Sequence, residues 1–256
     1  MGGGADLEGK SALVTGAARG LGRAIAALFA ERGAQVVLSD VDAAAAERAA
    51  SEIGDRAQSV RCDVTSADEV RAAIDATTSA HGGLDVLVNN AGVEIAKPMT
   101  EHGDEEFVRL LQVNVAGVFL CTKYAVPALA AGGDGAIVNL ASVAGMGGAP
   151  LLSAYCASKA AVIRFTEVCA IELRDAGIRV NAVCPAFIDT EMVERIVPTY
   201  ESALGMPFDE VLALKQGRMG QPAEVAEMAA FLASDEASFT TGSHYVLDGG
   251  VTASLL

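Results

Sequence analysis

The chain has 256 residues, of which 52% are hydrophobic, and this length suits one α/β domain or two small ones. Its mean hydropathy of +0.37 excludes a long disordered acidic chain and predicts a globular protein. The net charge of −15 disfavours nucleic acid and anionic membrane surfaces as partners, because clustered lysines and arginines bind both.

Short β-branched runs alternate along the chain with longer alanine-rich segments of helical spacing. The runs are apolar throughout, which is typical of parallel strands covered on both faces. We therefore expect a single Rossmann-type domain over residues 1–256, an α/β doubly wound fold with a seven-stranded parallel sheet. The predicted strands are 12–14, 35–38, 59–62 (the weakest), 85–88, 136–140, 179–183 and 244–247.

Three helix starts support this arrangement. Asp42 precedes an alanine run as an N-cap, Ser66 is followed three residues later by Glu69, and Pro222 opens a helix with Glu224 in its first turn. A further helix is predicted from 153 to 176.

Residues 186–221 contain no clear strand and follow the sixth strand of the chain, at the sheet edge where such folds bind ligands. We expect the part from about 190 to 221 to be a lid over the substrate; an ordinary helical insertion is the alternative. Pro198 and Pro207 should interrupt it. Its apolar residues are Met192, Val193, Ile196, Val197, Tyr200, Leu204, Met206, Phe208, Val211 and Leu212.

A glycine-rich turn follows the first predicted strand and runs into a helix. Glycine is needed where a backbone turns sharply and where a pyrophosphate must approach the N-terminus of a helix. The spacing Gly-x3-Gly-x-Gly differs from GxGxxG and from the phosphate loop of ATPases, so kinase-type chemistry is disfavoured. The predicted cofactor contacts in this turn are Gly16, Arg19, Gly20, Leu21 and Gly22.

Asp40 ends the second strand about 20 residues after these glycines. An acidic side chain there accepts hydrogen bonds from ribose hydroxyls and repels a 2′-phosphate. We therefore expect NAD to be preferred over NADP. Asp40 could instead cap a helix, but Asp42 suits that role better.

Tyr155 and Lys159 lie four residues apart in a predicted helix, so their side chains share a face. A nearby ammonium group favours the phenolate and should lower the pKa of Tyr155. The pair could act as an acid and base, and Ser142, which follows the fifth strand, could bind a substrate oxygen. A Tyr-x3-Lys pair alone is more often a surface pair, so the interpretation depends on the combination of motifs.

Together these motifs resemble the short-chain dehydrogenase/reductase family, in its compact single-domain form, from Leu7 to about Gly250. The motifs in order are Thr15 to Gly22, Asp63-Val64, Asn89-Asn90-Ala91-Gly92, Asn114, Ser142 and Tyr155-x3-Lys159. The resemblance implies that Tyr155 transfers a proton to or from the substrate oxygen, that Lys159 binds the nicotinamide ribose and that Ser142 orients the carbonyl. Asn114 would hold a water molecule that links Lys159 to solvent.

The same resemblance implies further cofactor contacts. Asp63 and Val64 should meet adenine, Asn90 the adjoining ribose, and Ile188 and Thr190 the nicotinamide carboxamide. It also implies a homo-oligomer, a tetramer by analogy. Ala186 stands where the family usually has glycine, so a positive φ there would strain the loop that carries Ile188 and Thr190.

The expected reaction is NAD-dependent interconversion of a hydrophobic secondary alcohol and its ketone, with an alicyclic, aryl or steroid-like small molecule as substrate. Reduction of 3-ketoacyl groups of fatty-acid type is the alternative enzyme, and a non-catalytic dinucleotide sensor is the alternative from another class. Glu94, Met146, Gly147 and Leu151 could shape the pocket.

Several residues have simpler interpretations. One of Asn89 and Asn90 is expected mainly to satisfy backbone groups, Cys156 to pack in the interior, and His244 to be structural.

The remaining features predict a cytoplasmic protein. The first six residues lack the basic and apolar regions of a signal peptide, and every apolar run is interrupted before membrane-spanning length. With three histidines and no CxxC pair, a zinc site and zinc-dependent alcohol dehydrogenation are disfavoured. The cysteines should be reduced core thiols: Cys62, Cys121, Cys156, Cys169 and Cys184.

Overall fold

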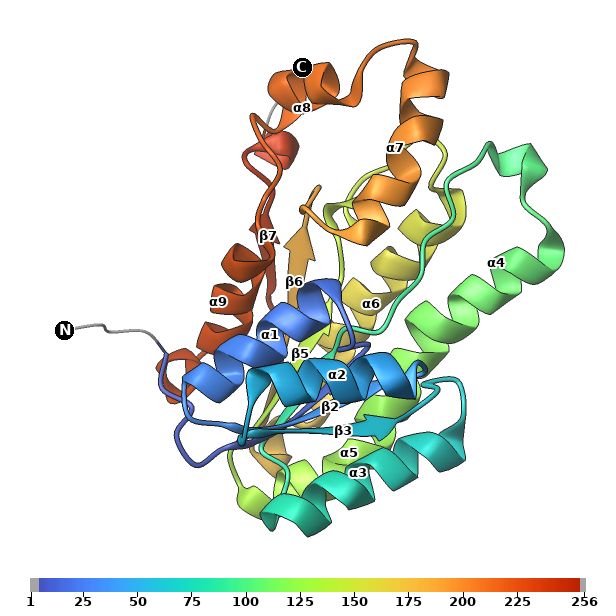
Figure 1. Ribbon diagram of the computed structural model, residues 1–256. Helices are drawn as coiled ribbons and strands as arrows, with labels where there is room; N and C mark the ends of the chain where they lie inside the picture. The colour runs from blue at the N-terminus through green and yellow to red at the C-terminus, as the bar shows by residue number, and fades with distance from the viewer. Residues whose placement is uncertain (1–4, 254–256) are drawn as a thin grey trace.

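A single parallel sheet organises the chain. The computed structural model describes residues 5–253, so the first four residues, on which part of the targeting prediction rests, lie outside it. The seven strands pair in the order β3-β2-β1-β4-β5-β6-β7 (Figure 1). The order reverses between β1 and β4, which is where ligands bind in doubly wound folds. The predicted fold class is confirmed.

The strands follow the predicted runs closely, apart from their ends. The third strand begins two residues before its prediction and leaves out Cys62, because it lies at the sheet edge with mostly exposed side chains and has no apolar run to mark its limits. The strands are β1 Ser11–Thr15, β2 Gln35–Asp40, β3 Ala57–Arg61, β4 Val86–Asn89, β5 Gly135–Leu140, β6 Ile178–Pro185 and β7 His244–Leu247.

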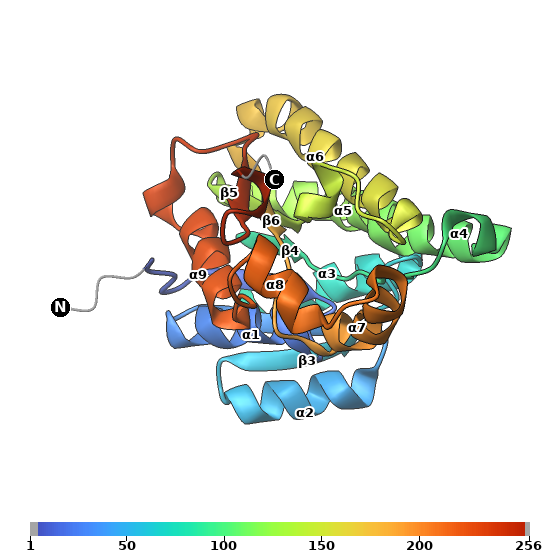
Figure 2. The ribbon, with the colours of Figure 1, turned by 90° about the horizontal axis from the view of Figure 1, so that it is seen from above.

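Helices cover both faces of the sheet. Seen from above, α1 and α9 lie on one side, and α5 and α6 on the other (Figure 2). A π-helical turn, Gln112–Ala116, joins α4 to α5, and α6 ends before its predicted limit, with a short 3-10 turn after it. The α-helices are α1 Gly20–Glu31, α2 Ala43–Ile53, α3 Ala67–His81, α4 Asp104–Leu111, α5 Gly117–Gly132, α6 Ser153–Glu172, α7 Glu191–Leu204, α8 Phe208–Lys215 and α9 Pro222–Ala233.

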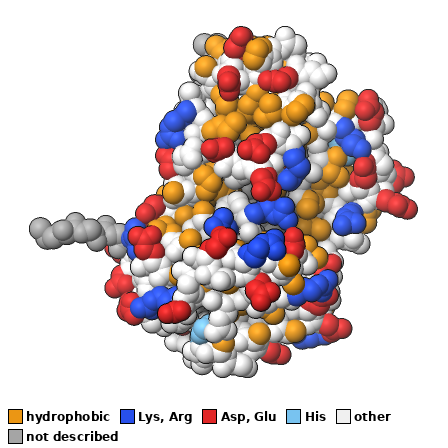
Figure 3. Space-filling view, in the orientation of Figure 1, with side chains coloured by type: hydrophobic (Ala, Val, Ile, Leu, Met, Phe, Trp, Pro, Cys, Tyr) orange, Lys and Arg blue, Asp and Glu red, His pale blue; other side chains and the backbone are white. Residues whose placement is uncertain are grey.

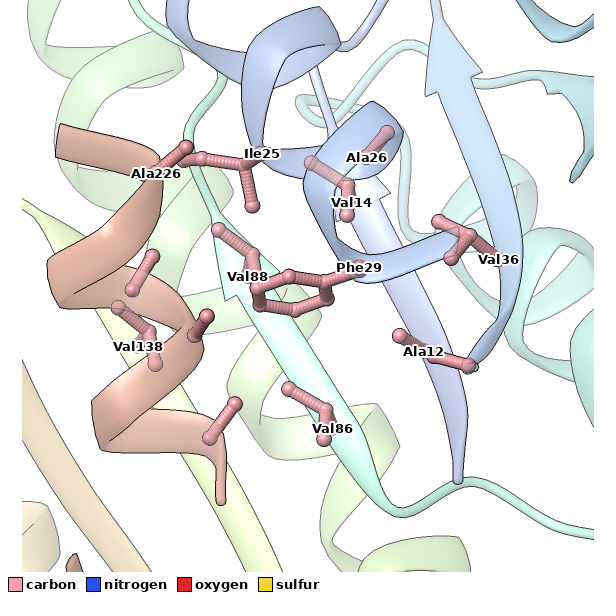
Figure 4. Close-up of a cluster of buried hydrophobic side chains, with 14 of the residues drawn as sticks. Ala12, Val14, Ile25, Ala26, Phe29, Val36, Val86, Val88, Val138 and Ala226 are labelled. Atoms are coloured by element: carbon pink, nitrogen blue, oxygen red, sulfur yellow. The ribbon is translucent and has the colours of Figure 1, made fainter. Parts of the chain in front are cut away.

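Alternate residues of each central strand enter different cores. In β1, Val14 packs with Ile25 and Phe29 of α1 on one face (Figure 4), while Leu13 packs with the cluster under α3 and α5 on the other. Phe29 is fully buried. Burial on both faces explains why the central strands are apolar throughout.

The three predicted helix starts are confirmed. Asp42 accepts a hydrogen bond from the Ala45 amide at 3.0 Å, and Ser66 accepts one from the Glu69 amide at 3.4 Å. Pro222 stands in the first turn of α9. These caps fix the helices that follow β2 and β3, and hence the strand ends that face the site.

One helix corrects the expectation about apolar runs. From Asp104 to Gly132 the chain is continuously helical and contains an 18-residue window with a mean hydropathy of 1.5, so by length and composition this helix could cross a membrane. It contacts α3, α6 and the strands β4 and β5. Of its most apolar window 33% is buried inside the molecule, while Phe107, Val108 and Phe119 along the helix are exposed.

The expected lid consists of two helices, α7 and α8, over the carboxyl end of the sheet (Figure 2). Pro207 precedes α8 and separates the two, as expected. Pro198 does not interrupt the segment but lies inside α7. Proline has no backbone N–H, so the carbonyl group one helical turn earlier lacks its usual donor. Pro198 is exposed, so water can donate a hydrogen bond to that carbonyl group instead.

Candidate active site

A cavity of about 800 Å³ opens at the carboxyl end of the sheet, between the strand ends and α7. The predicted catalytic pair, Tyr155 and Lys159, and much of the predicted cofactor site share it. The predicted residues that line it are Gly16, Arg19, Gly20, Leu21, Asp40, Asp63, Val64, Asn90, Tyr155, Lys159 and Thr190. Gly22, Asn114, Ser142 and Ile188 do not line it.

The glycine turn is built so that side chains cannot fill it. Gly16 and Gly20 have φ of 63° and 56°, in the left-handed region. A Cβ on Gly16 would lie 2.7 Å from the Cα of Ala91, and one on Gly22 would lie 2.5 Å from the Gly16 carbonyl oxygen. Arg19 at the N-cap of α1 makes no capping hydrogen bond. The first amides of α1 therefore face the cavity without a side-chain acceptor at the cap, as an anion site requires.

Asp40 lies beside this turn and does not cap α2. Its carboxylate accepts hydrogen bonds from the Ala18 amide at 3.1 Å and the Asp42 amide at 3.0 Å. Arg19 lies nearby but is paired with Asp42 at 3.7 Å and with Glu191 of α7 at 3.4 Å. The carboxylate at the end of β2 is thus fixed where the chain turns into the cavity.

The asparagines after β4 hold the strand ends together. Asn90 donates to the carbonyl oxygens of Thr15 and Gly16, both at 2.9 Å, while the buried Asn89 donates to Asn139 at 2.8 Å. Both asparagines therefore make structural contacts, whereas the sequence led us to expect this role mainly for one of them. Asn90 also lines the cavity, so contact with a ribose would have to be made alongside these bonds.

Asp63 and Val64 follow β3 at the far end of the cavity. Hydrogen bonds from Thr65 hold the pKa of the Asp63 carboxyl below its ordinary value, so it is ionised at neutral pH. Nearby, burial raises the pKa of the Cys62 thiol to about 12 and keeps it protonated. All five cysteines are free.

Tyr155 and Lys159 project from α6 into the cavity from the side of β5. The Lys159 ammonium lies 5.5 Å from the centre of the Tyr155 ring and donates to the Leu140 carbonyl oxygen at 2.7 Å. Burial lowers the pKa of Lys159 from 10.5 to about 8. The two side chains share a helix face, as their spacing predicted.

The pKa of Tyr155 differs from the expectation. Burial raises it above the ordinary 10, and a hydrogen bond with Ser142 lowers it only in part. The prediction that Lys159 depresses it is therefore wrong for the protein without a bound dinucleotide. The physical reason is that a desolvated phenolate is costly, and the lysine donates to Leu140 instead.

Ser142 and Asn114 lie next to the cavity without lining it, and Ser142 is hydrogen-bonded with Tyr155. Ser142 donates to the Pro185 carbonyl oxygen at 3.3 Å. Asn114 is buried in the π-helical turn; its side chain accepts from the Val93 amide and donates to the Val93 carbonyl oxygen, both at 2.8 Å. It thereby fixes the loop after β4 beside Lys159.

The loop after β6 is relaxed despite Ala186. Leu151 is the one non-glycine residue with positive φ in the part of the chain that the structure describes, so Ala186 is not strained. Ile188 is buried and bridges to Gly220, whereas Thr190 caps α7 and lines the cavity. Of Ile188 and Thr190, only Thr190 lines the cavity in which the cofactor is predicted to bind.

The lid residues form an apolar cluster against α6, the helix that carries Tyr155. Tyr155 and Cys156 pack on it, which fits the packing role expected for Cys156. His244 is exposed on the edge strand β7. The buried members of the cluster are Leu152, Val193, Ile196, Tyr200, Phe208 and Leu212.

Two arginines at the cavity were missed in the sequence. Arg109 of α4 and Arg195 of α7 both line it. Figure 3 shows basic side chains gathered near the middle of this face, with hydrophobic side chains above them toward the end that carries α7 and α8. The sequence signal that could have found Arg195 is its spacing of four residues from Glu191, which puts both side chains on one side of α7.

Among residues 5–253 no group of three or more histidine, cysteine or acidic side chains is placed to hold a metal ion.

Comparison with known proteins adds to this geometry. A family model described as enoyl-(acyl carrier protein) reductase matches residues 16–252. The chain is 44% identical to cis-4-hydroxycyclohexanecarboxylate dehydrogenase of Sinomonas cyclohexanicum, over 94% of this chain and 96% of that one. It is 41% identical to cyclopentanol dehydrogenase of Comamonas testosteroni, over 96% and 98%.

Solved structures agree in fold over nearly the whole chain. A short-chain type dehydrogenase/reductase from Mycobacterium marinum has a TM-score of 0.89 at 40% identity, covering 97% of this chain and 98% of that one. Levodione reductase has a TM-score of 0.92 at 32% identity, covering 96% and 99%.

Proposed function

The chain belongs to the short-chain dehydrogenase/reductase family, and from this premise we propose that it interconverts a cyclic, hydrophobic secondary alcohol and its ketone with NAD. It is an oxidoreductase of a family whose dehydrogenases use nicotinamide dinucleotides. Two relatives named above are dehydrogenases of cyclic alcohols, which supports the alicyclic substrate over the aryl or steroid-like ones.

The observation that carries the proposal is the position of the catalytic pair. Tyr155 and Lys159 line the same cavity as the glycine turn and Asp40. The lid cluster packs on Tyr155 and provides an apolar wall. A ring compound held against that wall would bring its oxygen toward a phenol, and proton transfer by a positioned group supplies typically ~10²–10⁴-fold in rate.

The residues present fit a dinucleotide. The turn at Gly16 and Gly22 has no room for side chains, and the start of α1 suits a pyrophosphate. Asp40 supports NAD over NADP, because its fixed carboxylate would repel a 2′-phosphate. When bound, the nicotinamide would supply the hydride acceptor or donor.

The chain's own residues would manage the proton. At neutral pH Tyr155 holds its proton, since its pKa lies above 10, so it can donate to the oxygen of a ketone. Ser142 would orient that oxygen through its hydroxyl group. Lys159 would keep the site positively charged below its pKa of about 8, and Asn114 holds the adjoining loop.

Replacing Tyr155 with phenylalanine tests this function. The variant should bind NAD nearly as the wild type does and lose most turnover of cyclohexanol, roughly 10²-fold or more. NADH absorbance and a dinucleotide titration measure the two effects. Tyr124→Phe, on α5 outside the cavity, is the matched control and should keep its activity. Turnover at the wild-type level in Tyr155→Phe would refute the proton-transfer role.

The description of the matching family model names an acyl carrier, which favours a second candidate, reduction of the 3-keto group of a carrier-bound acyl chain. Acidic residues on the lid argue against a phosphate-bearing carrier: Glu191, Glu194, Glu201, Asp209 and Glu210. Turnover of a 3-ketoacyl thioester with NADPH, faster than that of any cyclic ketone, would decide for it.

We further propose that the protein is cytoplasmic and a homotetramer. Its free cysteines support a reducing compartment. Light scattering after size-exclusion chromatography would give the subunit number.

A further inference from the structure

The carboxylate of Glu94 lies almost fully buried next to the cavity; it does not itself line the cavity, but its ion-pair partner Arg195 does, and neither the proton transfer nor the dinucleotide uses it. Glu94 follows Val93, the residue that Asn114 fixes and that lines the cavity. Its side chain is 7% exposed. Burial raises the pKa of Glu94, and its charge in turn raises the pKa of Tyr155, so the carboxylate is within electrostatic reach of the phenol.

Glu94 has one partner from another element. Arg195 of α7 lies 3.4 Å from its Oε2, a long contact, and its own backbone N–H is the other donor that reaches it within the described chain. A carboxylate can accept about four hydrogen bonds, so acceptor capacity is left over. A buried carboxylate with so few hydrogen-bond donors destabilises the fold unless a ligand supplies further donors.

Arg195 also has capacity to spare. It lines the cavity with a half-exposed side chain, and its contact with Glu94 uses one of five N–H donors. The pair therefore offers acceptors and donors side by side, with no net charge. A hydroxyl group donates one hydrogen bond and accepts up to two, so it suits this pair better than a carboxylate, which Glu94 would repel, or a plain hydrocarbon ring.

We infer that Glu94 and Arg195 form a specificity site for a second hydroxyl group on the ring, so that the preferred substrates are cyclic diols and the corresponding hydroxyketones. This inference rests on the proposed function, since it assumes that the first oxygen of the ring lies at Tyr155. The apolar lid cluster would cover the carbon skeleton between the two polar ends.

The test compares kcat/KM for cyclohexane-1,4-diol, cyclohexanol and 4-hydroxycyclohexanecarboxylate. The wild type should prefer the diol by more than the statistical advantage of its two equivalent hydroxyls. Glu94→Ala should lower the ratio of kcat/KM for the diol to kcat/KM for cyclohexanol roughly 10- to 100-fold, mainly through KM for the diol, because an effect of the lost charge on Tyr155 would act on both alcohols alike. Glu94→Gln, which keeps an acceptor oxygen, should recover part of the loss.

The control separates specificity from lid stability. Arg218 pairs with Glu224 between the end of the lid segment and α9, and it does not line the cavity. Arg218→Met should therefore leave the ratio of diol to cyclohexanol unchanged. NAD titration of each variant checks that the dinucleotide end is intact.

The outcomes are distinguishable. If Glu94→Ala lowers kcat/KM equally for the diol and for cyclohexanol, or changes neither, the specificity site is refuted while the dehydrogenase stands. Preference for the hydroxycarboxylate would also overturn it, because Arg195 alone would then be the ligand. If the wild type oxidises none of the three alcohols, the proposed function itself fails, and this inference with it.

Discussion

Replacing Lys159 with methionine should remove a pH-dependent part of the free energy of unfolding. Burial lowers the pKa of this lysine from 10.5 to about 8. Between those values the unfolded chain binds more protons than the folded one, so the stability of the wild type should rise with pH. Methionine, with no proton to bind, should lack this rise.

The magnitude follows from the same two values. At about pH 7 nearly the whole shift acts against folding, about 3 kcal/mol, and at about pH 9.5 about 1 kcal/mol is left. The difference between wild type and Lys159→Met should therefore change by about 2 kcal/mol across this interval, in favour of the wild type at the higher pH. The hydrogen bond from Lys159 to the Leu140 carbonyl oxygen affects the constant difference in stability between wild type and Lys159→Met, not the change of that difference with pH.

Urea denaturation at several pH values, without dinucleotide, measures this difference. Lys123→Met, at an exposed position on α5, is the control and should follow the wild-type slope. Parallel stability curves for wild type and Lys159→Met would refute the claim that the buried ammonium is destabilising. Lys159→Met should also lose turnover, so that this residue would favour function at the expense of stability.

Three further outcomes follow from the geometry. Asp40→Ala should narrow the preference for NAD over NADP, measured as the ratio of kcat/KM values; an unchanged ratio would place the selectivity elsewhere. Gly16→Ala should weaken dinucleotide binding and lower the melting temperature, because its Cβ would lie 2.7 Å from the Ala91 Cα. Leu151→Gly should stabilise the fold by roughly 1 kcal/mol, since Leu151 holds a φ of 69°; a loss of stability would show that its side-chain packing outweighs the backbone strain.

The elements whose signals are local were predictable from the sequence. Asp42 caps α2 and leaves Asp40 free to face the glycine turn, as the residue types and spacing indicated. The central strands stood out because burial on both faces requires continuous apolar residues. The edge strand β3 has mostly exposed side chains, so its limits carried no comparable signal.

Other features depend on partners that are distant in sequence. Pro198 lies inside α7 because its face of the helix is exposed to water, which the sequence alone does not indicate. The pairing of Glu94 with Arg195 joins residues 101 positions apart. Neither residue belongs to a motif, and α7 must first be placed over the loop after β4 before the two can be related.

The protonation states of Tyr155 and Lys159 could not be predicted from the sequence either. The spacing of Tyr155 and Lys159 fixed their shared helix face, but the balance between burial and charge depends on the depth of the cavity and on where the ammonium donates. Here Lys159 donates to Leu140, and burial is the largest influence on both pKa values. Whatever lowers the pKa of the phenol for alcohol oxidation must therefore arrive with the bound dinucleotide or the substrate. Accordingly, a titration of Tyr155 should move to lower pH when NAD is added, and an unmoved titration would assign the role of base to another group.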